Sequence, residues 1–155
     1  MILEYAKVRM DAIEPSRANP SDAGLDVFYC PESLDWSGLT INPGESRIIP
    51  TGLRFGVPHG FMLEVKNRSS VAAKRSLLVG ACVVDPGYDG ELFVNLHNVG
   101  TSEQFIAAGD KIAQIVMIPV VHFRACESDS GDLYNWEQIA ISERGDGALG
   151  STDEQ

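Results

Sequence analysis

Apolar side chains along this chain recur in short runs with a period of two, separated by turns rich in Pro, Gly and Asp. Phe61, Leu63 and Val65 alternate with neighbours that include Glu64 and Lys66. A period of two places successive side chains on opposite faces of a strand, with one face buried. Strands are therefore predicted over residues 4–10, 24–29, 39–41, 47–50, 61–66, 91–97 and 112–121.

Two of these segments carry further expectations. Residues 112–121 are almost continuously apolar, which predicts a strand that is buried on both faces. The sequence Asn42-Pro43-Gly44-Glu45 separates segments 39–41 and 47–50 and predicts a hairpin-like turn between them. Only residues 71–75 suggest a helix. Many short strands with regular turns predict an all-β fold, a jelly-roll-like β-sandwich or barrel with one short helix and a flexible C-terminal arm.

Length, charge and cysteine content limit the domain organisation, the binding partners and the cellular compartment that this sequence allows. The 155 residues fit one domain, expected as a core over 1–126, an acidic connector over 127–143 and a glycine-rich arm over 144–155. A formal net charge of −10 argues against direct binding to nucleic acid, and no apolar run is long enough to span a membrane. The three cysteines lack metal-ligand spacing and indicate reduced thiols in a cytoplasmic protein.

Two segments in the first half of the chain carry chemistry that packing alone does not require. Asp26 lies within an otherwise apolar strand, and a buried carboxylate is costly unless it is paired or bound to a metal. Its alternative role is to cap the end of the strand. Arg68, Ser69 and Ser70 stand where a strand gives way to a helical turn, a place that suits a phosphate. Ordinary N-capping by Ser69 or Ser70 is the alternative.

Two segments of the second half add a carboxylate, a ring and an amide. Asp85-Pro86-Gly87 is a turn sequence, and it brings Asp85 within three residues of Tyr88. A carboxylate beside a phosphoester can orient and deprotonate water, and a tyrosine ring can pack on a sugar. Gln114 opens the buried strand, where its amide needs partners.

The fifth segment is the tail, residues 144–152. Its spacing Gly145-x4-Gly150-Ser151-Thr152 is that of a P-loop, but Ser151 stands where that motif requires Lys. The tail is better interpreted as a flexible arm that closes over a phosphate chain held elsewhere. A frayed, glycine-rich end is the alternative.

Taken in order and with their spacing, these five segments resemble the trimeric dUTPase family from about residue 22 to residue 152. The segment Thr51-Gly52-Leu53 is similar to that family as well. The resemblance implies a β jelly roll, a homotrimer with shared active sites, and Mg²⁺-assisted hydrolysis of dUTP to dUMP and pyrophosphate. Such an enzyme limits uracil in DNA and supplies dUMP for dTMP synthesis.

The resemblance also implies roles for residues that act on the phosphates. Asp26 would hold Mg²⁺ through its water shell, and Asp85 would contact the 3′-hydroxyl of the deoxyribose and activate the attacking water. Gln114 would help to place that water and the α-phosphate. The residues implied to bind the phosphate chain are Arg68, Ser69, Ser70, Arg144, Ser151 and Thr152.

Other residues would recognise the nucleoside. Tyr88 would pack on the deoxyribose and exclude a 2′-hydroxyl. The backbone of a hairpin around Gly80 to Val84 would bind uracil. Leu149, followed by Gly150, stands where the family usually has Phe, so it would cover the base without a stacking ring.

Two other functions remain open at this level. A dCTP deaminase of the same fold would need a Glu where this chain has Asn95 and an Arg where it has Ala73, and an amide cannot shuttle protons as a carboxylate does. The second possibility is a regulatory protein that uses the nucleotide pocket as a switch, with the acidic connector contacting an unknown partner.

Overall fold

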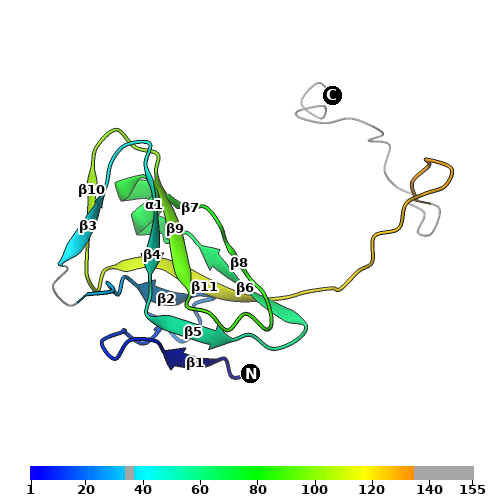
Figure 1. Cartoon of the computed structure of the whole chain (residues 1–155), viewed down its shortest axis with the longest axis horizontal. Coiled ribbons are helices and arrows are strands. Elements are labelled where there is room, and N and C mark those ends of the chain that lie inside the picture. Colours follow the sequence, from blue (N-terminus) through cyan, green and yellow to red (C-terminus); the bar gives the residue numbers. More distant parts are fainter. Residues whose placement is uncertain (34–36, 135–155) are drawn as a thin grey trace. The chain divides into compact units, whose positions relative to one another are not determined.

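The computed structural model describes residues 1–33 and 37–134, in which the regular secondary structure consists of antiparallel strands and one short helix (Figure 1). The chain divides into two units, residues 1–122 and 123–155. Within residues 123–134 of the second unit, the structure assigns neither a helix nor a strand. The expected arm over 144–155 lies outside the described residues, as do residues 135–143 of the connector. The boundaries of core, connector and arm therefore stay predictions.

The first unit contains two larger sheets and two strand pairs. One sheet has the order β2-β11-β6-β8 and the other the order β4-β9-β7, while β1 pairs with β5 and β3 with β10. The strands are β1 (Glu4–Lys7), β2 (Leu25–Phe28), β3 (Gly38–Ile41), β4 (Ser46–Pro50), β5 (Leu53–Gly56), β6 (Phe61–Lys66), β7 (Leu77–Val79), β8 (Val83–Val84), β9 (Phe93–Asn98), β10 (Gln104–Ala107) and β11 (Lys111–Pro119). This arrangement confirms the all-β, jelly-roll-like prediction.

One hydrophobic core joins the two larger sheets. Val27, Leu63 and Ala113 of one sheet and Val94 and Leu96 of the other are essentially inaccessible to solvent and belong to the same cluster. Each of the Val and Leu side chains among them contributes roughly 1.5–3 kcal/mol when it is fully buried. The period of two in the sequence therefore reflects strands with one face in this core.

The short helix α1 (Ser69–Arg75) follows β6 and packs next to β7, with Val71 buried (Figure 1). It ends at Ser76, which has a left-handed conformation with φ 53° and whose N–H donates to Ala72 O and Val71 O. Lys74 and Arg75 in the last turn favour the negative end of the helix dipole. The predicted helix at 71–75 is confirmed, and it begins two residues earlier.

The turn at residues 42–45 forms as predicted, but the hairpin-like pairing around it is wrong. Glu45 N donates to Asn42 O, and Gly44 has φ +76°. The strands on either side belong to different sheets, because β3 pairs with β10 and β4 pairs with β9. Local turn chemistry does not choose strand partners, whereas burial of each strand in the core does.

A second expectation is only partly correct. β11 is buried at Ile112, Ala113 and Ile115, but its residues from Val116 onward are half-buried or exposed. The reason is that β2 pairs with β11 only as far as Ile115, after which β6 is the one neighbouring strand. The predicted hairpin around Gly80 to Val84 is also wrong, because β7 pairs with β9 and β8 pairs with β6. Residues 80–82 thus cross from one sheet to the other.

Asn98, at the end of β9, is 1% exposed and ties three segments together. Its amide nitrogen donates to Ile41 O and to Ser102 O, both at 2.8 Å, and its Oδ1 accepts from Gly100 N at 3.0 Å. Among the described helices, the longest is too short to cross a membrane, and none is a candidate span.

We predict that Asn98→Ala lowers the free energy of unfolding by at least about 2 kcal/mol, because it leaves buried backbone groups without partners. Denaturant unfolding at a fixed protein concentration measures this. The matched control is Thr101→Ala in the neighbouring exposed loop, which should stay within about 0.5 kcal/mol of the wild type. Equal midpoints for the two variants would contradict the role assigned to Asn98.

Candidate active site

The central strand β11 brings together two of the residues singled out in the sequence. Gln114 lies opposite Asp26 of β2 on one side and opposite Lys66 of β6 on the other. Residues directly opposite one another in an antiparallel sheet present their side chains on the same face. The sheet therefore aligns Asp26, Gln114 and Lys66 across three strands.

Asp26 is 8% exposed and is neutralised by two cations. Its Oδ1 accepts from Arg68 Nε at 2.7 Å, and its Oδ2 lies 2.8 Å from Lys111 Nζ. These contacts supply the compensation that a buried carboxylate requires. Asp26 lies inside β2 and binds side chains, so the alternative of a strand-end cap is wrong.

Gly24 makes room for Gln114, a role that sequence reasoning did not assign to it. A Cβ atom on Gly24 would stand 2.2 Å from Gln114 Oε1 and 2.9 Å from Gln114 Cδ. Gln114 Nε2 donates to Asn67 O at 2.9 Å, which fixes the amide plane at the end of β6. The only signal for this in the sequence was the glycine two positions before Asp26.

The start of α1 completes this part of the site. Arg68 is the N-cap residue and makes no side-chain cap hydrogen bond, so N-capping by Ser69 or Ser70 is wrong. Ser70 Oγ instead lies 3.4 Å from Arg68 Nη1. These side chains border a hollow of about 160 Å³, here called the Asp26 hollow. It is lined by Ala18, Asp22, Gly24, Asp26, Arg68, Ser69, Ser70 and Gln114.

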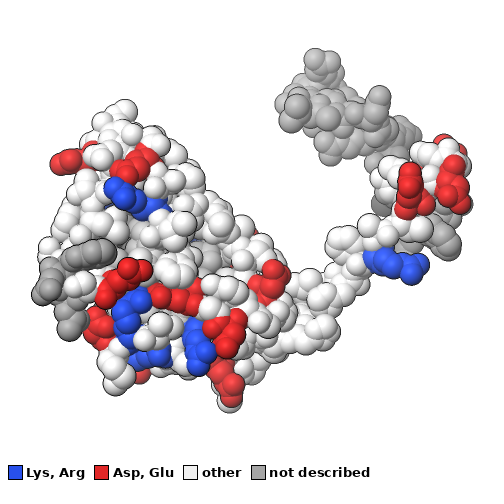
Figure 2. All heavy atoms as spheres, viewed as in Figure 1, with Lys and Arg blue, Asp and Glu red and all other residues white. Residues whose placement is uncertain are grey.

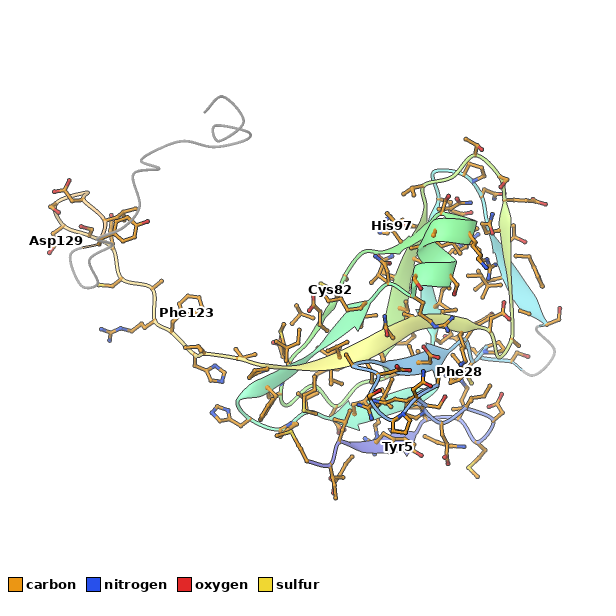
Figure 3. The ribbon with its side chains drawn as sticks, turned by 180° about the vertical axis from the view of Figure 1, so that it is seen from behind. Tyr5, Phe28, Cys82, His97, Phe123 and Asp129 are labelled. Carbon is orange, nitrogen blue, oxygen red and sulfur yellow. The ribbon has the colours of Figure 1, made fainter. Side chains whose placement is uncertain are left out.

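A second hollow, of about 220 Å³ and here called the Asp85 hollow, lies beside β6 and β8. Its lining is more apolar than that of the Asp26 hollow, and it includes Cys82, which lies next to β8 (Figure 3). Cys82 O accepts from Val65 N at 2.7 Å. The lining residues are Val65, Ala81, Cys82, Val83, Val84, Asp85, Tyr88, Glu91, Leu92 and Phe93.

Asp85 and Tyr88 stand at the edge of the Asp85 hollow, on the loop between β8 and β9. Both side chains are exposed. The loop closes through Tyr88 N, which donates to Asp85 O at 3.3 Å, and through Gly87, whose φ of +85° suits glycine. Asp85 and Tyr88 thus line the same hollow, as residues of one loop.

Of the described residues, none lines both hollows. Val65 of β6 borders the Asp85 hollow, and Arg68, just beyond β6, borders the Asp26 hollow. Gly80 lies outside both linings and donates its N–H to Asn95 O at 2.9 Å. The arm residues Arg144, Leu149, Gly150, Ser151 and Thr152 lie outside the described part of the chain.

Comparison with known proteins matches this chain to one class, the dUTPases. The family model "dUTPase" matches residues 10–152. A deoxyuridine 5′-triphosphate nucleotidohydrolase of Gloeobacter violaceus is 36% identical over 140 residues, covering 89% of this chain and 87% of that protein. One from Desulfitobacterium hafniense is 37% identical over 155 residues, covering 97% and 95%.

Solved structures of dUTPases have the same fold as this chain. The dUTPase of Staphylococcus bacteriophage 80alpha with dUpNHpp superposes with a TM-score of 0.79 at 23% identity, covering 97% of each chain. A dUTPase from phage phi11 of S. aureus, described with a structural Mg(II) ion, gives a TM-score of 0.74 at 22% identity and covers 83% of this chain and 97% of that one. The chain belongs to the dUTPase family.

We predict that Gly24→Ala displaces Gln114 and lowers turnover of dUTP on the order of ten- to a hundredfold, because small misplacements in an active site are costly. The melting temperature should change little, since the atoms that must move belong to a side chain. Gly56→Ala is the matched control: its Cβ would meet its nearest neighbour at an ordinary 3.7 Å. Full activity of Gly24→Ala would contradict the role assigned to Gly24.

Proposed function

We propose that this protein hydrolyses dUTP to dUMP and pyrophosphate, which limits uracil in DNA and supplies dUMP for dTMP synthesis. The observation that carries the proposal is the joint presence of a charged hollow around Asp26 and a more apolar hollow edged by Asp85 and Tyr88. The first suits a phosphate chain and the second a nucleoside. Membership of the dUTPase family supports the same assignment.

The Asp26 hollow suits phosphates through its cations and hydroxyls. Arg68 offers a forked donor, and Ser69 and Ser70 add hydroxyl groups at its rim. Gln114 would place the α-phosphate and the attacking water, because its amide is held by Asn67 beside Asp26. Arg144, Ser151 and Thr152 of the arm would close on the outer phosphates.

The donor set fits Mg²⁺ held through water and phosphate oxygens. No three His, Cys, Asp or Glu side chains of the described residues form a metal cage. Asp22 and Asp26 nevertheless line the same hollow as Arg68, which matches the preference of Mg²⁺ for one or two carboxylates together with substrate phosphates. When bound, the ion would supply charge neutralisation that makes pyrophosphate a better leaving group.

The Asp85 hollow suits deoxyuridine. The ring of Tyr88 would pack on the deoxyribose, and the backbone from Gly80 to Val84 would hydrogen-bond to uracil. Leu149 and Gly150 of the arm would cover the base. Asp85, exposed at the edge of the hollow, would accept the proton of a water aligned with the α-phosphorus.

We further propose a homotrimer whose subunits share each active site. In a single copy of the chain, the two hollows have no lining residue in common. The outer face of the β4-β9-β7 sheet also exposes Ile48, Leu78 and Phe93, an apolar surface that a second copy would cover.

The free cysteines and the nucleotide substrate of this protein favour action in the cytoplasm.

Hydrolysis of dUTP is favoured over deamination of dCTP. The deaminase would need a carboxylate at position 95, where this chain has an amide. Asn95 Oδ1 lies 2.8 Å from His97 Nε2, so this amide is engaged with an imidazole on the same strand. The direct test is release of pyrophosphate from dUTP, compared with dCTP, UTP and dTTP, in the presence of Mg²⁺. Ammonia release from dCTP without pyrophosphate from dUTP would overturn the assignment.

Asp85→Asn should lower turnover of dUTP by about 10²–10⁴-fold while leaving dUMP binding largely intact, because it removes the base and keeps the shape. Pyrophosphate release and calorimetric titration with dUMP measure the two effects. Asp89→Asn, a change of the same kind on the same loop, is the matched control, since the Asp89 side chain is 86% exposed and pairs with Arg54. Wild-type turnover in Asp85→Asn would remove Asp85 from the mechanism.

Co-refolding Asp85→Asn subunits with subunits that lack residues 144–155 should restore activity that neither variant has alone. If Asp85 and the arm of one site come from different subunits, random trimers contain roughly a quarter of intact sites. Light scattering and pyrophosphate release measure assembly and recovery. A monomer, or a trimeric mixture without recovery, would contradict shared sites.

A further inference from the structure

The loop that carries Asp85 and Tyr88 crosses between the two larger sheets. It leaves β8, which pairs with β6, and enters β9, which pairs with β4 and β7. No strand pairing fixes the residues in between. Their position therefore depends on the contacts at the end of the loop, at Glu91 and Leu92.

Arg9, from the segment after β1, holds Glu91 with both branches of its guanidinium group. Arg9 Nη1 donates to Glu91 Oε2 at 3.0 Å, and Arg9 Nη2 contacts Glu91 Oε1. Arg9 Nη2 also donates to Cys30 O at 3.0 Å, while Nε lies 3.4 Å from Cys30 Sγ. All three guanidinium nitrogens are thus engaged, which fixes the plane of the group.

This ion pair is shielded from water. The side chains of Arg9 and Glu91 are 19% and 10% exposed. The hydrogen bonds that Arg9 donates to Glu91 raise the pKa of Arg9 further above its ordinary value, so Arg9 stays charged. A shielded, two-pronged pair of this kind is geometrically specific, because the carboxylate can rotate little without losing a donor.

The backbone of Gly52 supplies a further donor to the same carboxylate. Gly52 N donates to Glu91 Oε1 at 2.7 Å. Gly52 has φ +70°, and a Cβ atom there would stand 2.7 Å from Ala12 Cβ and 2.9 Å from Cys30 Sγ. Only glycine allows the chain to approach so closely, so Glu91 is held from three segments: residue 9, residue 30 through Arg9, and residue 52.

The position of Glu91 in turn determines the position of the Tyr88 ring. The Tyr88 hydroxyl donates to Glu91 O at 2.9 Å. The ring lies across Gly90, where a Cβ atom would stand 2.4 Å from the hydroxyl oxygen and 2.6 Å from Cζ. Movement of Glu91 therefore moves the acceptor to which the ring is anchored.

We propose that Arg9 and Glu91 are positioning residues that set the orientation of Tyr88, and thereby the preference of this protein for deoxyribonucleotides over ribonucleotides. Neither residue needs to touch the nucleotide. The proposal rests on the proposed function, in which Tyr88 packs on the deoxyribose. It adds Arg9 and Glu91, which act through Tyr88, to the determinants of sugar specificity.

A second ion pair on the same loop provides the comparison. Arg54 Nη1 lies 2.9 Å from Asp89 Oδ1, but these side chains are 47% and 86% exposed. Exposed pairs of this kind contribute little, because water screens them and their side chains lose entropy on pairing. Arg54→Gln removes a charge and a contact from the loop without disturbing the anchor at Glu91.

The experiment compares Glu91→Gln, Arg9→Lys and Arg54→Gln with the wild type. For each protein, kcat and KM are measured with dUTP and with UTP. Calorimetry measures the binding of dUMP and of UMP. Inhibition by tripolyphosphate reports binding at the Asp26 hollow. In Glu91→Gln and Arg9→Lys we expect the ratio of dUMP to UMP affinity to fall about tenfold, the equivalent of about 1.4 kcal/mol, and KM for dUTP to rise. Inhibition by tripolyphosphate, and all values for Arg54→Gln, should match the wild type.

The results distinguish a specific effect on sugar preference from a general structural effect. An unchanged dUMP to UMP ratio in Glu91→Gln overturns the proposal, even if stability falls. Equal losses of dUMP and tripolyphosphate binding also overturn it, because they indicate a general structural effect. Glu91→Gln keeps the side-chain volume and an acceptor for Gly52 N–H, so it decides the question if Arg9→Lys does not fold. A wild-type protein that binds dUMP over UMP without hydrolysing dUTP refutes the proposed function alone.

Discussion

The pairing of β11 with both β2 and β6 is the constraint on which the candidate site depends. A strand between two neighbours has its register fixed on both sides, since a slip of one residue would turn its apolar side chains out of the core. Ile112, Ala113 and Ile115 hold this register through burial. The position of Gln114 between Asp26 and Lys66 follows from the packing of its neighbours, not from any attraction among the polar groups themselves.

The segments that cross between sheets are anchored by polar groups with little exposure to solvent. Asn98 holds the segment 42–45, which connects two sheets, through hydrogen bonds to Ile41 O and to the backbone of Gly44 and Glu45. Thr51 Oγ1 donates to Leu92 O at 2.7 Å, at the point where the loop that carries Asp85 returns to the core. Glu91 serves the same loop through Arg9 and Gly52. Such anchors are specific in direction, which apolar contacts are not, so they suit segments that strand pairing leaves undetermined.

Charge in this protein is organised locally. The chain is acidic overall, with a formal net charge of −10, yet Asp26 lies between Arg68 and Lys111. Figure 2 shows acidic and basic side chains intermingled on the face in view. Local cations therefore offset the negative charge of Asp26, although the chain as a whole is acidic.

The sequence by itself determined the class of fold, the short helix and the identity of the chemical groups. Alternation with a period of two, turn residues at 42–45 and the polar residues set into apolar runs are local signals. The structure pairs Asp26 with Arg68 and places Asp85 and Tyr88 in the lining of one hollow, while their roles in catalysis and binding stay predictions. Only the tertiary structure decided which strands pair. In the tertiary structure, β3 and β4 have different partner strands, the second half of β11 is mostly half-buried, and residues 80–82 cross between the sheets. The tertiary structure also revealed the contacts of Gly24, Arg9 and Glu91, because these depend on atoms brought together from distant parts of the chain, and hydrophobic periodicity carries no information about such neighbours.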